Sequence, residues 1–213
     1  MRVREVQAEL RGKTLIIPLE KPPALVAGVD AAFLDDSIIS VACLYRYPEL
    51  TLVEEKYVVK KLRFPYIPGF LSFREGPAAI EAIEKLSIRP DCVIFDGQGI
   101  AHPKRIGVAS YVGVLLDMPV VGCAKSRLVG EYKEPGKRRG SWSPLKFDGD
   151  TVGAVLRTRT NVKPLFISPG NRIDIRGSIE IILGCTVKYR LPEPIRRADA
   201  LSKRLKKTMM EGA

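Results

Sequence analysis

The stretch LVAGVDAAFLDDSIISVACLYR, residues 25–46, decides the fold of this 213-residue chain. Its two apolar runs, residues 25–33 and 38–46, predict buried β-strands. The turn residues Asp35-Asp36-Ser37 between them predict that the two strands form an antiparallel hairpin. Residues 52–62 carry further apolar residues and predict a third antiparallel strand.

The pattern changes to alternating helices and strands after the turn-rich segment 65–69. Pro77 predicts the first turn of a helix that ends before Pro90. The next expected elements are a strand over 92–96, a helix over 104–117 and a strand over 120–124. Helices placed between strands predict parallel pairing with right-handed crossovers.

The C-terminal part predicts a hairpin, a short strand and two helices, over residues 145–148 with 151–158, 165–168, 173–185 and 193–207. Three antiparallel strands followed by parallel βα units predict an α/β fold, a ribonuclease H-like mixed sheet flanked by helices. The chain has no linker or internal repeat and its length fits one core, so we expect residues 1–213 to form a single domain.

Lys and Arg outnumber Asp and Glu by 35 to 24, which gives a net charge of +11. Two segments, residues 125–146 and 188–207, carry the whole excess. Charge runs are often only solvated surfaces, but confinement to two segments favours phosphate binding. The charge therefore indicates a nucleic acid as the partner.

Cysteine and histidine usage excludes several kinds of site. The cysteines lie apart in apolar runs and are expected to be reduced core residues: Cys43, Cys92, Cys123 and Cys185. His102 is the only histidine, which excludes a site that needs two imidazoles. The charged N-terminal segment has no signal-peptide pattern and no apolar run reaches the length of a membrane span, so we expect a cytoplasmic protein without a membrane partner.

Two acids mark a candidate metal site. Asp30 interrupts a buried strand, where an ionised carboxylate is costly unless it is paired or binds a cation. Asp96 ends another strand, and ligand sites in α/β sheets lie at the carboxyl ends of parallel strands. If the first and fourth strands are neighbours, the two carboxylates converge on a site suited to Mg²⁺ or Mn²⁺. The alternative for Asp96 is a role in capping a turn.

Four further polar residues have a functional and a structural interpretation. Glu75 is expected in the first turn of a helix, where the helix dipole also favours a negative charge. Asp199 is expected near the inward stripe of the last helix, although surface ion pairs are the commoner role. Lys125 directly follows a strand and can meet a phosphate there. His102 is either an ordinary loop residue or a donor to a developing oxyanion.

The string PYIPGFLSFRE at residues 65–75 resembles a motif of the endonuclease V family, the deoxyinosine 3′-endonucleases. Further segments match the family in the same order: AGVD (27–30), FDGQG (95–99), AHP (101–103), GVAS (107–110), VGCAKSRL (121–128), PLFISPG (164–170) and LPEP (191–194). The resemblance runs from residue 25 to residue 207, and the long string around Tyr66 is specific.

The resemblance implies a DNA repair endonuclease that hydrolyses the second phosphodiester bond on the 3′ side of a deaminated purine, leaving a 3′-hydroxyl and a 5′-phosphate. Carried over by motif, the expected metal ligands, for Mg²⁺ with Mn²⁺ as a substitute, are Asp30, Glu75, Asp96 and Asp199. The expected catalytic residues are Asp30, Glu75, Asp96, His102 and Lys125. Such an ion would activate water and offset charge on the phosphate.

The resemblance also implies contacts with deoxyinosine-containing DNA. Tyr66, an aromatic residue between two prolines, is expected to act as a rigid wedge in the space left by the rotated lesion. The hypoxanthine base is expected near Leu71, Gly97 and Gly99, where missing side chains let backbone groups reach the base. The full set of expected substrate-binding residues is Pro65, Tyr66, Ile67, Pro68, Gly69, Leu71, Arg74, Gly97, Gly99 and Ser126.

Two alternatives stay open. An endoribonuclease specific for inosine in RNA would use the same metal chemistry, so these residues do not distinguish DNA from RNA. A non-catalytic nucleic-acid-binding protein of the same fold would use the basic segments and the wedge without cutting, although the presence of all four acids speaks against it. The sequence predicts neither the number of metal ions nor the oligomeric state.

Overall fold

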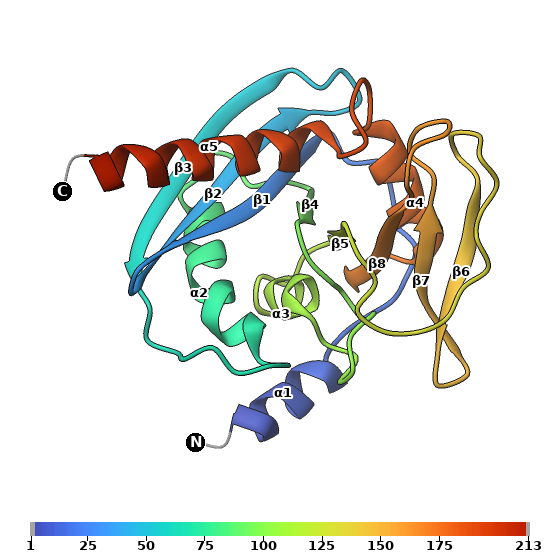
Figure 1. Cartoon of the computed structure of the whole chain (residues 1–213), viewed down its shortest axis with the longest axis horizontal. Coiled ribbons are helices and arrows are strands. Elements are labelled where there is room, and N and C mark those ends of the chain that lie inside the picture. Colours follow the sequence, from blue (N-terminus) through green and yellow to red (C-terminus); the bar gives the residue numbers. More distant parts are fainter. Residues whose placement is uncertain (1–2, 212–213) are drawn as a thin grey trace.

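The computed structural model describes residues 3–211, which form a mixed sheet with the strand order β3-β2-β1-β4-β5-β8-β7-β6 (Figure 1). The strands are β1 Leu25–Leu34, β2 Ser37–Arg46, β3 Leu52–Lys61, β4 Cys92–Phe95, β5 Val120–Ala124, β6 Trp142–Phe147, β7 Asp150–Leu156 and β8 Leu165–Asn171. The helices are α1 Val3–Gly12, α2 Leu71–Glu84, α3 Val108–Leu115, α4 Ile175–Gly184 and α5 Glu193–Glu211.

The pairing of the strands confirms the predicted fold class. Strands β1, β2 and β3 are antiparallel neighbours, as their apolar runs and the turn at Asp35-Asp36-Ser37 predicted. Strand β4 pairs in parallel with both β1 and β5. Strands β8, β7 and β6 then extend the sheet in antiparallel order from β5.

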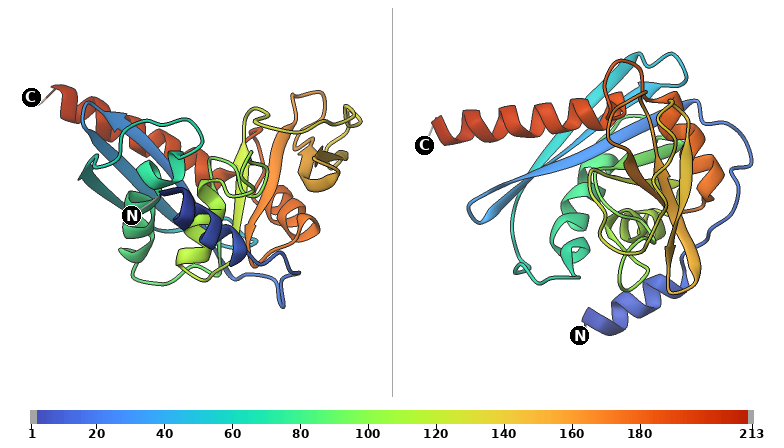
Figure 2. Two further views of the ribbon diagram at one scale, coloured as in Figure 1. Left: turned by 90° about the horizontal axis from the view of Figure 1, so that it is seen from below. Right: turned by 45° about the vertical axis from the view of Figure 1, so that its right-hand side comes forward.

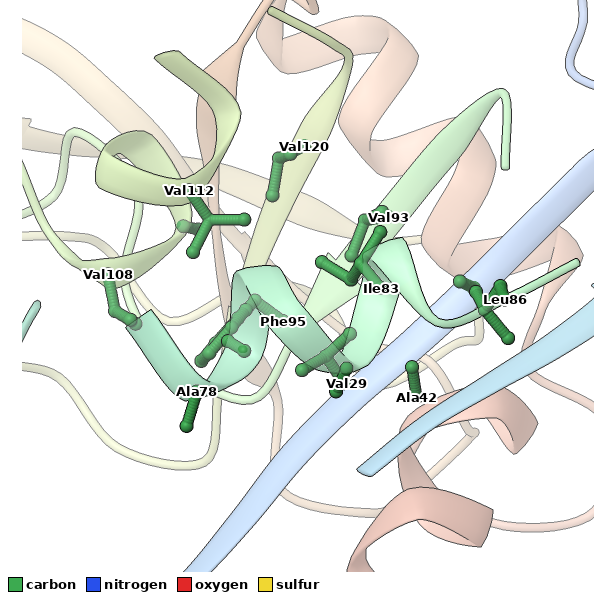
Figure 3. Packing of buried hydrophobic residues seen from close by; sticks show 14 of the residues in the cluster. Val29, Ala42, Ala78, Ile83, Leu86, Val93, Phe95, Val108, Val112 and Val120 are labelled. Atoms are coloured by element: carbon green, nitrogen blue, oxygen red, sulfur yellow. The ribbon is translucent and has the colours of Figure 1, made fainter. Parts of the chain in front are cut away.

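Helices cover both faces of the sheet (Figures 1 and 2). On one face, Phe95 of β4 packs among residues of α2 and α3, including Ala78 and Val108 (Figure 3). On the other face, Ile94 belongs to the apolar cluster that includes Ile182 of α4. Adjacent residues of β4 thus point to opposite faces of the sheet, and both faces are covered. Because the strand is buried on both sides, its sequence is almost wholly apolar.

The bounds of α2 and α3 differ from the prediction, and α5 runs to Glu211, beyond the expected end at residue 207. Helix α2 begins at Leu71, and Pro77 lies inside it and not in its first turn. Packing of the Phe73 ring against Phe64 and Tyr111 stabilises the extra N-terminal turns, and tertiary contacts of this kind outweigh a local breaker. Helix α3 is shorter than residues 104–117 because left-handed backbone at Arg105 and Asp117 interrupts the helical pattern at both ends.

Helix α1 was missed in the sequence, where charges dominate the N-terminal segment. Its buried residues Gln7 and Leu10 lie one turn apart, and Val3 and Val6 share the same helical stripe. The predicted cysteine state is confirmed, since all four cysteines are free and buried. No helix within residues 3–211 combines the length and apolar character that a membrane crossing needs.

Gly28 of β1 sets the position of α5. A Cβ atom at Gly28 would lie 2.1 Å from the carbonyl carbon of Pro194 and 2.4 Å from the nitrogen of Ile195. Only glycine permits this close approach of the helix N-terminus to the strand. Because α5 carries Asp199, the contact also positions part of the candidate site.

We expect Gly28→Ala to lower the free energy of unfolding by about 2 kcal/mol, since the new methyl group must displace α5. For a chain of this size the loss corresponds to a fall in Tm of roughly 4–8 °C, which calorimetry measures. Gly12→Ala is the matched control, because a Cβ atom at Gly12 meets nothing within 4 Å. Equal Tm values for the two variants would contradict this account of the α5 contact.

Candidate functional site

The register between β1 and β4 brings Asp30 and Asp96 together. Val29 lies opposite Phe95 in this parallel pair, so the residues that follow them are neighbours. The backbone N–H of Asp96 donates to the carbonyl oxygen of Val29 at 3.1 Å and continues the pairing by one residue. The convergence that the sequence predicted from the two strands is therefore present.

Helix α5 adds a third carboxylate to this pair. One oxygen from each of Asp30, Asp96 and Asp199 lies within 4.8 Å of the others. The buried hydroxyl of Ser202 donates to Asp30 Oδ2 at 3.2 Å, and its oxygen also lies 3.0 Å from the carbonyl oxygen of Asp199. Sequence analysis assigned no role to Ser202, although its place three residues after Asp199 puts it on the same side of the helix.

Glu75 lies close to Asp30 and Asp96 but outside the group of three aspartates. It occupies the second turn of α2, so the expected place in the first turn is wrong. Burial raises the pKa of Glu75 to about 7, and the charges of Asp30 and Asp96 add to the effect. Burial likewise raises the pKa of Asp30 to about 6, with further contributions from Asp96 and Asp199. Both shifts reflect negative charge crowded into a partly dry site.

Two lysines offset part of this charge. Lys125 Nζ lies 2.5 Å from Asp96 Oδ2 and 3.8 Å from Asp199 Oδ1, and Lys203 Nζ lies 2.8 Å from Asp199 Oδ2. Partial burial disfavours the charged form of Lys125, but the hydrogen bond and charge of Asp96 outweigh it and raise the pKa of Lys125. Clustered carboxylate oxygens of this kind fit a hard divalent cation such as Mg²⁺ or Mn²⁺.

The hydrogen bond of the His102 side chain is made to the backbone and not to one of these acids. It is buried, and its Nδ1 accepts a hydrogen bond from the backbone N–H of Lys104 at 3.2 Å. Burial, together with the charge of Lys104, lowers the pKa of His102 to about 4, so the ring is neutral near pH 7. The side chain lines a cleft between α1 and residues 68–70. Its expected role at the scissile phosphate stays a prediction.

The wedge segment, residues 65–69, has an exposed tip and a fixed base. The side chain of Tyr66 is 68% exposed, and Ile67 is also exposed. At the base, Gln7 Nε2 donates to the carbonyl oxygen of Gly69 at 2.9 Å. Arg74 Nη1 donates to the carbonyl oxygen of Phe64 at 3.2 Å, which supports the segment from the other end. An exposed aromatic residue on a braced loop has the form that a wedge requires.

The expected base-binding loop is held tightly by its surroundings. A Cβ atom at Gly99 would lie 2.0 Å from the carbonyl oxygen of Pro169, and one at Gly97 would meet Val108 at 2.6 Å. Packing therefore requires both glycines for reasons independent of a base. Gln98 Nε2 donates to the carbonyl oxygen of Ser126 at 3.2 Å and joins this loop to the one after β5.

The base-binding assignments of Leu71, Gly97, Gly99 and Ser126 stay predictions. Leu71 is partly exposed at the start of α2, and Phe70 separates it from the wedge segment.

Some cations of the two basic segments have internal partners. Arg197 of α5 pairs with Glu55 of β3, and Arg196 pairs with Glu193 within the helix. Arg139 donates to the carbonyl oxygens of Leu183 at 2.8 Å and Thr186 at 3.1 Å. The net excess of positive charge is therefore only partly available to a partner.

Comparisons with known proteins identify the family of the chain. A sequence model of the family described as Endonuclease V matches residues 8–200. The chain is 48% identical over 208 residues to endonuclease V of Dictyoglomus turgidum, which covers 98% of this chain and 91% of that relative. The crystal structure of endonuclease V from Streptomyces avermitilis is similar with a TM-score of 0.93 at 41% identity, over 98% of this chain and 93% of that one.

A second similar structure carries a nucleic acid. It is endonuclease V of Ciona intestinalis in complex with a 24mer DNA containing an inosine followed by a ribo-adenosine. The TM-score is 0.85 at 25% identity, and the alignment covers 97% of each chain.

The raised pKa values predict how pH acts on the metal-free protein. Asp30 and Glu75 bind protons more tightly in the folded than in the unfolded chain, so their contribution to stability is present at low pH. It is lost as pH rises through about 6 and 7, the two folded pKa values. We expect the Tm of the metal-free protein to fall more between about pH 5 and pH 8 than that of the Asp30→Asn/Glu75→Gln variant.

The same groups must ionise to bind a cation, so Mn²⁺ is expected to raise Tm more at about pH 8 than at about pH 5. The double variant is the control and is expected to show little response to Mn²⁺ at either pH. An equal rise in Tm with Mn²⁺ at both pH values in the unmodified protein would contradict the assignment of Asp30 and Glu75 as ligands of the cation.

Proposed function

The chain belongs to the endonuclease V family and is a nuclease, and we propose that it is a divalent-metal-dependent DNA repair endonuclease that recognises deaminated purines. We propose that it hydrolyses the second phosphodiester bond 3′ to the lesion and leaves a 3′-hydroxyl and a 5′-phosphate. The observation that carries this proposal is the cluster of Asp30, Asp96 and Asp199, with one oxygen of each within 4.8 Å of the others.

Three features support a nucleic acid that contains a deaminated purine as the target. The similar endonuclease V of Ciona intestinalis is in complex with inosine-containing DNA. The net charge of +11 suits a polyanionic partner. Tyr66 is exposed on a braced loop, where it can replace a base that has been rotated out of the stack.

The acids of the cluster would hold Mg²⁺, with Mn²⁺ as a substitute. When bound, such an ion supplies an activated water and offsets charge on the phosphate. Asp30, Asp96 and Asp199 offer oxygen ligands, and Ser202 orients Asp30. Glu75 is the fourth expected ligand, and because its burial and the charges of Asp30 and Asp96 raise its pKa, it must lose a proton to bind the ion.

Two basic side chains complete the proposed mechanism. Lys125 is the counter-ion of Asp96 and can turn to a nonbridging phosphate oxygen once the charge of the acids is neutralised. Because Nδ1 of neutral His102 accepts a hydrogen bond, its proton lies on Nε2. His102 can therefore donate a hydrogen bond through Nε2 to the negative charge that develops on the departing 3′-oxygen.

Inosine-containing RNA is a second candidate substrate. The nucleic acid bound to the Ciona intestinalis relative has a ribonucleotide directly after the inosine. A site that accepts a ribose at that position in the substrate is compatible with cutting RNA.

The test is cleavage of matched DNA and RNA oligonucleotides, each with one inosine, in Mg²⁺. Inosine-free oligonucleotides and EDTA serve as controls. We expect a metal-dependent cut one nucleotide beyond the inosine, and the ratio of the two rates ranks DNA against RNA. Absence of cutting on both substrates, with binding intact, would favour the non-catalytic alternative.

Asp96→Asn is expected to lower the single-turnover rate at least about a hundredfold while lesion binding persists, because a ligand of the ion is lost. Asp148→Asn is the matched control. It removes the same charge in the turn between β6 and β7, where the left-handed backbone tolerates Asn. Cutting by Asp96→Asn at the rate of the unmodified protein would refute the metal assignment.

Tyr66→Ala is expected to weaken binding to inosine-containing DNA about tenfold relative to undamaged DNA, because stacking on the neighbouring base is lost. Tyr57→Ala is the control, since Tyr57 is also exposed but lies on the edge strand β3. Competition binding measures the ratio of the two affinities. An unchanged ratio for Tyr66→Ala would rule out the wedge.

A further inference from the structure

We propose that the groove between α1 and the wedge segment seats backbone phosphates of the bound nucleic acid, anchored by Arg4 and Arg11 of α1 and by Lys104. We call this cleft the α1 groove. The inference rests on the proposed function, since it adds a contact to the same substrate. It assigns a role to a helix that lies apart from the carboxylate cluster and that the motifs of the chain do not include.

One face of α1 forms the first wall of the groove. Arg4, Gln7, Ala8 and Arg11 line it and recur at the spacing of a helical stripe. Pro68, Gly69 and Phe70 form the opposite wall, and the groove ends at His102-Pro103-Lys104. Its volume is about 680 Å³.

The charge of the groove has a single sign. Arg4, Arg11 and Lys104 are exposed, and none of the described residues that line the groove is acidic. Glu9 belongs to the same helix but not to the lining, and it accepts a hydrogen bond from Lys13 at 2.6 Å. His102 is neutral near pH 7 because burial lowers its pKa to about 4. Two guanidinium groups and one ammonium group in an open cleft match phosphate oxygens.

The two walls are fixed to each other and to the core. Gln7 is buried, and its side-chain amide donates to the carbonyl oxygen of Gly69 in the opposite wall. Just beyond α1, the N–H of Leu15 donates to Asn171 Oδ1 at 2.9 Å. The N–H of Arg172 donates back to the carbonyl oxygen of Leu15 at 2.6 Å. Arg4 and Arg11 are therefore presented from a preorganised surface, which lowers the entropic cost of binding.

The groove also adjoins the site of base displacement. A neighbouring cleft of about 560 Å³ shares Arg4 and Phe70 with it and is otherwise lined by Val3, Glu5, Phe64 and Ile67. Ile67 is next to Tyr66, so a strand opened by the wedge passes close to the groove. A phosphate contact there fixes the register of the nucleic acid without reading its sequence.

The test is the salt dependence of single-turnover cleavage of inosine-containing duplex DNA by Arg4→Gln/Arg11→Gln. Both residues are exposed and glutamine is a good helix former, so the fold is expected to persist, which Tm verifies. We expect the maximal rate to stay unchanged while the enzyme concentration for half-maximal rate rises. Loss of two phosphate contacts lowers the slope of log affinity against log salt by about 1.8.

This change in slope means that lowering salt from about 200 to about 50 mM strengthens binding about tenfold more for the unmodified protein than for the double variant. The matched control is Arg46→Gln/Lys85→Gln, which removes the same charge at exposed positions. Arg46 is the cross-strand partner of Leu25 at the start of β1, away from Asp30 on the same strand. Lys85 follows the end of α2, at the opposite end of this helix from the wedge segment. The control is expected to keep the original slope.

An unchanged slope in the α1 variant, or an equal fall in the control, would overturn the α1 groove as a phosphate seat. Failure of the proposed function looks different, because the unmodified protein would then not cut the inosine substrate at all. In that case the same slopes are read from equilibrium binding to undamaged duplex DNA, since a phosphate contact does not depend on the lesion. A lower slope for the α1 variant would still support the groove.

Discussion

The parallel register of β1 and β4 is the constraint on which the candidate site depends. With Val29 opposite Phe95, Asp30 and Asp96 must be neighbours, and both lie at the edge of a fully apolar sheet centre. Burial, together with repulsion from Asp96, raises the pKa of Asp30 to about 6. Lys125 pairs with Asp96 and Ser202 donates to Asp30, but these contacts offset only part of the negative charge. A chain with a net charge of +11 thus keeps a local excess of negative charge, which attracts a cation before it can tolerate a phosphate.

Helix α5 supplies the third carboxylate of the candidate site, Asp199. A strand at this edge points alternate residues to opposite faces, so a third acid on the same side must come from a covering element. Close approach at Gly28 brings the helix onto β1 and places Asp199 beside the strand acids. The basic residues of α5 are then divided in function. Arg197 joins the helix to β3 through Glu55, whereas Lys203 lies at Asp199. The basic segment is therefore partly a structural device and not a uniform binding surface.

The parts of the fold that sequence reasoning predicted are those specified by local pattern. Apolar runs with turn residues between them define β1 and β2, and the convergence of Asp30, inside β1, with Asp96, directly after β4, follows from the pairing of these strands. The start of α2 was missed because the aromatic contacts of Phe73 are made to residues distant in sequence. The wedge and Glu75 came from the family resemblance, since a short turn and one acid carry no such meaning alone. The surroundings of His102 depend on α1, a helix whose charges hide its apolar stripe.

Base displacement and cleavage are proposed for two different parts of the molecule, and α2 connects these parts. Displacing a base costs unstacking energy, and a loose loop would lose part of its binding energy in becoming ordered. The wedge segment avoids that loss because Gln7 and Arg74 hold its base. The same first two turns of α2 that follow the wedge segment also carry Glu75 toward Asp30 and Asp96. A helix is stiff over this length, so under the proposed function a lesion seated on the wedge segment lies at a fixed position relative to Glu75. Recognition and cleavage would then be coupled by a rigid connection of a few residues.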